Sequence, residues 1–173
     1  MGNTEGSRIL SLKISTSEAA FIAGFLEGDG CISAKIGPTS GSYRVRLIIS
    51  FTQLTKNKIV LEYIQKLIGG KMMDYSFRNM SELTIFDRGK VFEVLNILIP
   101  FLVSKKKQAE IGLEIIAILN KGKRGALRNS NDLLEAVRLA EEIRSLNSNR
   151  KDKTVHTIEK VVAFLKEKNI LTP

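Results

Sequence analysis

The segment from Phe21 to Gly30 constrains the fold of this chain more than any other part of the sequence. An apolar helical pattern runs over Ala19 to Glu27, with Ser17 as the expected N-cap and Gly28-Asp29-Gly30 as the stop. A glycine inside a helix costs about 1 kcal/mol relative to alanine, so glycines there need a structural reason. The small residues on one side of this helix are Ala20, Ala23, Gly24 and Gly28. Small residues at this spacing allow two helix backbones to approach closely, so the sequence predicts a tight contact with another helix.

An acidic residue stands at the end of the same helix. Asp29 lies where the helix dipole places partial negative charge, which disfavours a carboxylate unless a cation is near. A carboxylate together with a free main-chain carbonyl is the kind of hard oxygen site that Mg²⁺ prefers. Asp29 with the carbonyl of Gly28 is therefore a candidate metal site. The alternative is a glycine-flanked turn that the aspartate stabilises.

A β-hairpin is predicted directly after the helix. Its strands are Cys31 to Ile36 and Tyr43 to Phe51, joined by a loop at residues 37–41 that contains glycine and proline. Strict alternation gives the second strand an apolar face and a second face that carries Arg44 and Arg46. Such a ribbon fits the major groove of DNA, where arginine pairs with guanine. The alternative is a solvated sheet face whose basic side chains prevent aggregation.

The rest of the chain repeats this order and then becomes helical. Helices are expected at 56–68 and 90–99 on either side of two short strands at 72–77 and 82–86. On the short strands, alternation predicts an outward set, Asp74, Ser76, Arg78, Glu82 and Thr84, and an inward core set, Met73, Tyr75, Phe77, Leu83 and Ile85. Three more helices follow at 105–120, 131–146 and 155–168. The predicted fold class is therefore α+β, an αββαββα core followed by C-terminal helices.

Charge and composition exclude several classes of protein. The 173 residues carry 27 basic and 18 acidic side chains, a net charge of +9, and the stretch from Gly30 to Leu61 contains five basic residues and no acid. This indicates a polyanionic partner such as nucleic acid. One cysteine, Cys31, and one histidine, His156, exclude a disulfide framework and a Cys/His zinc site, and neither residue is given a role. Without a membrane-spanning or signal-like stretch, an intracellular, reducing location in the cytoplasm or an organelle matrix is expected.

The segment Ile22 to Gly30 resembles the motif of the LAGLIDADG homing endonucleases. Ala23, Gly24, Gly28, Asp29 and Gly30 match it, and Glu27 is a conservative variant of the earlier acid. The resemblance extends over about residues 15 to 150, and the motif occurs once. It therefore implies a homodimer in which the two Phe21–Gly30 helices pack together and two curved, four-stranded antiparallel sheets contact DNA. The chain is expected to divide into a weakly patterned arm at residues 1–15, an endonuclease domain at 16–150 and a C-terminal helix at 151–173 packed on that domain.

The resemblance assigns roles to individual residues. Asp29 matches the metal-binding acid, and Gly28 matches the residue whose carbonyl assists. Gln53, just after the second strand, matches a polar residue near the catalytic waters. Lys105 matches the active-site lysine, whose alternative interpretation is one member of a solvated basic helix start. One departure is Asn57, where relatives have a basic residue; the neighbouring Lys58 is its expected substitute.

The expected function is sequence-specific cleavage of double-stranded DNA at a long pseudo-palindromic site. The expected cofactor is Mg²⁺, with Mn²⁺ as a substitute and Ca²⁺ supporting binding without cleavage. The expected DNA-contacting residues are Ser33, Lys35, Arg44, Arg46, Ile48, Ser50, Asp74, Ser76, Arg78, Glu82 and Thr84. One alternative is an intron-splicing maturase, with intron RNA as its partner, or a non-cleaving binding protein of the same fold. Another is a basic ribosomal or transcription-factor domain, which leaves the glycine stripe and Asp29 unexplained.

Overall fold

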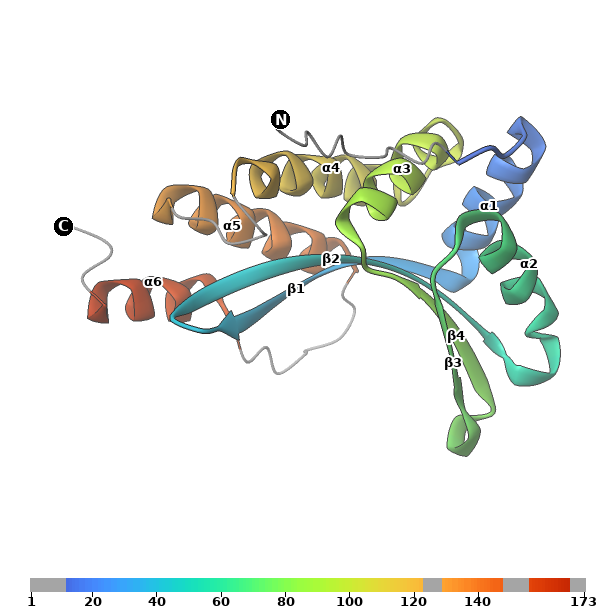
Figure 1. Cartoon of the computed structure of the whole chain (residues 1–173), viewed down its shortest axis with the longest axis horizontal. Helices are drawn as coiled ribbons and strands as arrows, with labels where there is room; N and C mark the ends of the chain where they lie inside the picture. The colour runs from blue at the N-terminus through green and yellow to red at the C-terminus, as the bar shows by residue number, and fades with distance from the viewer. Residues whose placement is uncertain (1–11, 123–128, 148–155, 169–173) are drawn as a thin grey trace, which may run out of the picture.

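The computed structural model describes residues 12–122, 129–147 and 156–168 (Figure 1). In chain order the elements are α1 Thr16–Asp29, β1 Gly30–Thr39, β2 Ser42–Leu54, α2 Ile59–Ile68, β3 Lys71–Tyr75, β4 Met80–Ile85, α3 Arg88–Leu98, α4 Lys106–Lys121, α5 Ser130–Asn147 and α6 Ile158–Glu167, with 3-10 turns at Thr55–Asn57, Ser76–Arg78 and Ile99–Phe101. The predicted αββαββα order followed by C-terminal helices is confirmed. Residues 1–11 of the predicted N-terminal arm and the predicted helix start at Val155 lie outside the described residues.

The strands form one antiparallel sheet in the order β1-β2-β4-β3. The sheet is long and curved, and the described helices lie on its convex side (Figure 1). Opposed residues of antiparallel strands point to the same face, so the register shows which side chains meet the helices. The helix-facing residues of the three longer strands are buried: Ile32, Ala34, Ile36, Val45, Leu47, Ile49, Phe51, Leu83 and Ile85.

The helices contribute the other half of this core. Their fully or almost fully buried side chains include Ile22 and Leu26 of α1, Leu61 and Ile64 of α2, Leu95 and Leu98 of α3, and Ile115 and Ile143 of α4 and α5. These positions recur every three to four residues, as expected for helices with one apolar face. The helices therefore cover one face of the sheet and leave the opposite face open.

Gly30 joins α1 to β1 at a point where the two backbones nearly touch. A Cβ built on Gly30 would lie 2.8 Å from Leu26 Cα and 2.9 Å from the Leu26 carbonyl oxygen. The N–H of Gly30 donates to that same carbonyl and ends the helix. A side chain here would force the backbone apart, so only glycine allows the strand to begin immediately after the helix.

Gly30→Ala is expected to lower the free energy of unfolding by about 1–3 kcal/mol, the usual cost of overpacking. Chemical denaturation measures the change. Gly37→Ala is the matched control, because Gly37 also lies in β1 and a Cβ there meets no described atom within 4 Å. Equal stability of Gly30→Ala and the unmodified protein would show that the helix-to-strand junction tolerates a side chain.

The structure corrects the predicted N-cap of α1 and the predicted hairpin loop. The N-cap of α1 is Ser15 rather than Ser17, and Ser15 forms a capping box with Glu18, whose carboxylate accepts the Ser15 N–H at 2.6 Å. The hairpin loop is shorter than the predicted residues 37–41, because Gly37 and Pro38 pair with β2 and the chain turns at Ser40 and Gly41. Gly41 has φ of +78°, a conformation that favours glycine.

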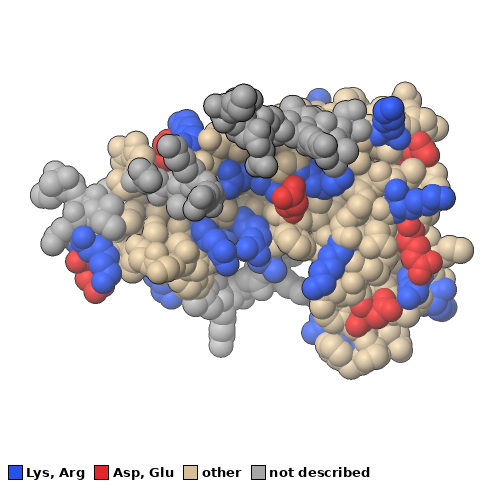
Figure 2. All heavy atoms as spheres, viewed as in Figure 1, with Lys and Arg blue, Asp and Glu red and all other residues tan. Residues whose placement is uncertain are grey.

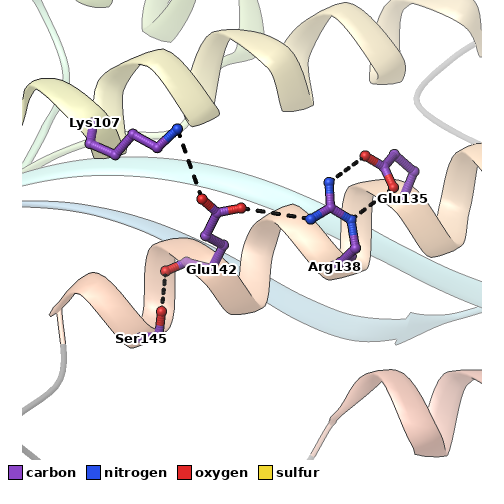
Figure 3. Close-up of polar contacts among 5 residues, drawn as sticks. All are labelled: Lys107, Glu135, Arg138, Glu142 and Ser145. Atoms are coloured by element: carbon purple, nitrogen blue, oxygen red, sulfur yellow. Dashed lines mark hydrogen bonds and ion pairs between the residues drawn. The ribbon is translucent and has the colours of Figure 1, made fainter.

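Polar contacts on the outer surface link α4 to α5 (Figure 3). Lys107 of α4 lies 3.9 Å from Glu142 of α5, and Arg138 contacts both Glu135 at 2.7 Å and Glu142 at 3.8 Å. Exposed pairs like these contribute little stability individually. At the end of α5, the amide of Asn147 donates to the Ile32 carbonyl at 2.7 Å and ties this helix to β1.

The last described helix packs near the far end of the hairpin. The ring of Phe164 in α6 packs edge-on against the ring of Tyr43, with 5.3 Å between the ring centroids. The ring of His156 packs in the same way, with its centroid 5.5 Å from that of Tyr43. The N–H of Ile158 donates to Glu141 of α5 at 3.0 Å. In the parts of the chain that the structure describes, none of the helices is long and apolar enough to cross a membrane.

Candidate active site and nucleic-acid interface

Asp29 is the last residue of α1, and its exposed carboxylate stands beside Gln53. The Gln53 amide Nε2 donates to Asp29 Oδ2 at 3.1 Å, and Gln53 Oε1 accepts the N–H of Leu54 at 2.8 Å. The second bond fixes the orientation of the amide, so the nitrogen rather than the oxygen faces the carboxylate. Gln53 lies inside β2 rather than after it as predicted, because β2 continues to Leu54.

Lys105 also contacts the C-terminal end of α1. Its ammonium Nζ donates to the main-chain carbonyl of Glu27 at 2.6 Å, and the residue occupies the N-cap position of α4. The last four carbonyls of a helix have no partner within the helix, and a positive charge there also interacts favourably with the dipole. An ammonium has three donors, so the Glu27 carbonyl leaves others for water or phosphate. Gln53 and Lys105 therefore both contact the last turn of α1, Gln53 through Asp29 and Lys105 through Glu27.

Glu27 is an additional residue of this site that the sequence did not identify as one. Its carboxylate accepts the N–H groups of Val103 at 2.8 Å, Ser104 at 3.1 Å and Lys105 at 3.0 Å, and it also accepts the Ser104 hydroxyl. Partial burial opposes ionisation, but the hydroxyl and the three N–H groups outweigh it and lower the pKa of the carboxyl below its ordinary value. Glu27 is thus a firmly ionised acceptor bound to the segment that precedes α4.

The donor set at the helix end suits a hard divalent cation. Asp29 offers an exposed carboxylate, and the neighbouring Gly28 belongs to the last helical turn, where carbonyls lack intrahelical partners. Within residues 12–122, 129–147 and 156–168, no group of three or more acidic, histidine or cysteine side chains could hold a metal ion. A cation held by Asp29 would therefore need further ligands from main-chain carbonyls, water, substrate or another chain.

The open face of the sheet carries most of the predicted DNA-facing residues. Register and alternation place Ser33, Lys35, Arg44, Arg46, Ile48, Ser50, Glu82 and Thr84 on the side opposite the helices. Lys35 and Arg46 are directly opposed and exposed, and Arg44 is exposed two pairs further toward the turn, opposite Gly37. The prediction that the first hairpin has an apolar face and a basic face is confirmed.

The predicted alternation of β3 is wrong. Asp74 is opposed to Ser81, a buried residue of β4, so Asp74 points to the helix side. A shift of one residue moves every side chain of a strand to the other face. Met73 and Tyr75, predicted as core, lie on the open face, where Met73 is 42% exposed. Phe77 is 77% exposed rather than buried, and it lies with Ser76 and Arg78 in the 3-10 turn.

Asp74 and Lys58 form a polar group between β3 and the start of α2. Asp74 accepts the Ser81 hydroxyl at 2.7 Å and the Lys58 ammonium at 3.2 Å. The Ser81 hydroxyl and the Lys58 ammonium hold the pKa of the Asp74 carboxyl below its ordinary value. Lys58, the expected substitute for a basic residue at position 57, therefore has Asp74 as its partner, with Glu62 3.7 Å away.

Register also adds residues to the open face that alternation along β3 had missed. Lys71 is opposed to Thr84, and Tyr75 lies on the same side as Glu82, to which its hydroxyl donates at 3.1 Å. This hydrogen bond raises the pKa of Tyr75. The β3–β4 pairing reveals these residues, and the sequence signal for it was weak because β3 has five residues and lacks a clear polar face.

Figure 2 shows where charge gathers on one side of the molecule. Lys and Arg side chains are spread along the middle of this view, whereas Asp and Glu side chains are most frequent at the end where α2 and the β3–β4 hairpin lie. The acid-free stretch from Gly30 to Leu61 includes both strands of the first hairpin. The basic end of the sheet is therefore the hairpin of β1 and β2.

A stripe of small residues runs along the outer face of α1. Ala20, Gly24 and Gly28 are exposed, and no described atom lies within 4 Å of a Cβ built on either glycine. Ala23, predicted to belong to this stripe, is fully buried in the core of its own chain because it follows Ile22 on the inner face. The stripe thus offers a flat, open helix surface with room for a second helix.

Comparisons with known proteins agree with this geometry. The family described as LAGLIDADG endonuclease matches residues 22–112. The DNA endonuclease I-CvuI of Chlorella vulgaris is 31% identical over 135 residues, which cover 76% of this chain and 81% of the relative. The DNA endonuclease I-CreI of Chlamydomonas reinhardtii is 30% identical over 164 residues, covering 88% and 93%. The crystal structure of I-CvuI with its target in the presence of Ca matches with a TM-score of 0.81 and 29% identity, covering 91% of this chain and 98% of the other.

Proposed function

The chain belongs to the LAGLIDADG endonuclease family, and on that premise we propose that it is a homing endonuclease that cleaves a specific double-stranded DNA site. The observation that carries the proposal is the meeting of Asp29, Gln53 and Lys105 at the end of α1, beside a sheet whose open face is basic. The curated relatives are named as DNA endonucleases, and the matched structure of I-CvuI contains its target.

We propose that the working molecule is a homodimer joined through the Phe21–Gly30 helix. Ala20, Gly24 and Gly28 leave the outer face of α1 open, and close contact with the same face of a second copy would explain glycine inside a helix. Two-fold symmetry brings the two α1 ends together, which supplies a second Asp29 carboxylate to a site where one chain has too few acids.

The proposed cofactor is Mg²⁺, held by the Asp29 carboxylate and the Gly28 carbonyl, with Mn²⁺ as a substitute. When bound, such an ion supplies charge stabilisation at the phosphodiester and lowers the pKa of water. The residues of this chain supply the rest of the chemistry. Gln53 orients Asp29 and has a second amide hydrogen for a water, and the Lys105 ammonium stabilises negative charge on the phosphate.

The proposed DNA-binding surface is the open face of the sheet. Lys35, Arg44 and Arg46 are exposed there and can pair with phosphates or with guanine edges. Lys71, Tyr75 and Glu82 extend the surface onto the second hairpin. Asp74 faces the helices and is not part of it. A reducing intracellular location, suggested by the single cysteine, and binding of intron RNA stay predictions.

The function is tested with a supercoiled plasmid carrying the flanking sequences of the gene's insertion point. Linearisation in Mg²⁺, and binding without linearisation in Ca²⁺, is the expected result. Adding a chelator to the Mg²⁺ reaction should stop cleavage completely. Specific binding in Mg²⁺ without any cut strand would instead support a non-cleaving protein of the same fold.

Arg46→Ala is expected to weaken binding of the target by about 1–3 kcal/mol and to relax the preference at one base pair, if the side chain pairs with a base edge. Titration of the target and of single-base variants in Ca²⁺ measures both effects. Arg138→Ala is the control, because this arginine pairs with acids on α5 and lies among the helices. Uniform weakening at all bases would show that Arg46 contacts phosphate only.

A further inference from the structure

The carboxylate of Glu27 accepts four hydrogen bonds, all from the segment that precedes α4. Its two oxygens accept three consecutive N–H groups, from Val103, Ser104 and Lys105, together with the Ser104 hydroxyl. These donors lie 76 to 78 residues further along the chain. A carboxylate that accepts several N–H donors holds their backbone in one conformation. Glu27 therefore fixes the start of α4 against the end of α1.

The fixed segment is the one that carries Lys105. α4 begins at Lys106, and no side chain of its own caps the helix, so the backbone at the N-cap depends on Glu27 for this fixation. With the main chain of Lys105 held, its Nζ reaches the Glu27 carbonyl at 2.6 Å. The carboxylate and the carbonyl of one residue thus hold both ends of the lysine.

We propose that Glu27 is a positioning residue for Lys105 in the cleavage reaction, an inference that rests on the proposed function. Glu27 and Asp29 stand two apart on α1 and point to different sides of the helix. The oxygens of Glu27 are directed to residues 103–105, whereas Asp29 is exposed beside Gln53. The two acids of the motif segment therefore have different roles. Asp29 is placed to hold the cation, and Glu27 fixes the position of Lys105 relative to the phosphate.

Glutamine cannot replace this carboxylate. An amide has one acceptor oxygen, and its NH₂ group would face N–H donors that it cannot satisfy. We expect Glu27→Gln to lower kcat by about 10²-fold, the loss that a displacement of about 1 Å of a catalytic group can cause. Affinity for target DNA in Ca²⁺ should stay within about twofold, because Glu27 is not on the open face of the sheet.

Glu18→Gln is the matched control for a merely structural role. Glu18 lies on the same helix, and its carboxylate also accepts a backbone N–H and a hydroxyl, both from Ser15 at the opposite end. A general loss of α1 stability would appear in both variants. A positioning effect should lower kcat in Glu27→Gln only.

A double-mutant cycle with Lys105→Ala gives the decisive comparison. If Glu27 acts through Lys105, Glu27→Gln should cause no further loss of kcat once the lysine side chain is absent. Independent, multiplicative losses would overturn the proposal, as would an equal loss in Glu18→Gln. If Glu27→Gln does not fold, Ser104→Ala removes a single contact and should show the same dependence on Lys105, or the proposal fails.

Amide hydrogen exchange at residues 103–105 separates this inference from the proposed function. Glu27→Gln should accelerate exchange of these three amides whether or not the protein cuts DNA, because the carboxylate is their acceptor. If the unmodified protein does not cleave its target, the proposed endonuclease function is refuted. Unmodified protein that cuts, with kcat unchanged in Glu27→Gln, would refute only the role of Glu27.

Discussion

Asp29→Asn is expected to abolish cleavage of target DNA while DNA binding persists. Asparagine keeps the size of the side chain and one oxygen that can accept the Gln53 amide, now 3.1 Å from Asp29 Oδ2. It removes the charge that would hold a divalent cation at the end of α1. Removing one charge-stabilising group from an active site costs at least about 10²–10³-fold in rate. In the proposed homodimer both copies of the chain would lose their carboxylate, so we expect no detectable product.

The measurement is plasmid linearisation in Mg²⁺ together with target affinity in Ca²⁺. Affinity should persist in Asp29→Asn, because the exposed basic residues proposed to bind DNA lie on the open face of the sheet and are unchanged. Asp87→Asn is the control, since Asp87 caps α3 through the Lys90 N–H at 2.9 Å and asparagine caps a helix equally well. Cleavage by Asp29→Asn at the unmodified rate would mean that Asp29 is a structural turn residue.

Gly24→Leu is expected to convert the protein into a folded monomer that no longer cuts both strands. Within the chain the substitution meets open space, since no described atom lies within 4 Å of the Cβ position. Leucine also favours the helix by up to about 1 kcal/mol over glycine, so α1 itself should not be weakened. The added side chain would, however, separate two α1 helices that pack through their small residues.

Sedimentation and circular dichroism distinguish these effects. The helical signal of Gly24→Leu should match that of the unmodified protein, whereas the sedimenting species should be half as heavy and double-strand cleavage should be lost. Gly89→Leu is the control, because Gly89 is an exposed glycine of α3 whose Cβ would meet only Asp87 Oδ1 at 3.5 Å. A Gly24→Leu dimer that cuts normally would show that the two copies join elsewhere.

Most of the fold could be predicted from local pattern. The first helix and hairpin have strong periodicity, which predicts their order and the two faces of the hairpin correctly, but not the N-cap, the turn, the end of β2 at Leu54 or the burial of Ala23. β3 could not be read in this way. Its five residues include two methionines and a tyrosine without a consistent polar side, and only pairing with β4 determines which of them meet the helices.

The candidate site divides in the same way. Asp29 stands out in the sequence because a carboxylate at a helix end needs an explanation, and the resemblance supplied Gln53 and Lys105, which the structure brings to that end. The task of Glu27 could not be found by pattern, because its donors belong to a turn 76 or more residues away and are main-chain groups that any residue has. Residue identity carries no information about such contacts.

The length of β2 has a consequence at the scale of a genome. Its 13 residues extend over about 40 Å, at about 3.3 Å per residue. One turn of duplex DNA rises about 34–36 Å along its axis, so a ribbon of this length laid along that axis would span about one turn. The two ribbons of the proposed homodimer would cover about 20 base pairs. A target sequence of this length can be unique among the roughly 10⁶–10⁹ competing sites of a genome. A nuclease that recognises a target of this length can cleave a chromosome at a single site.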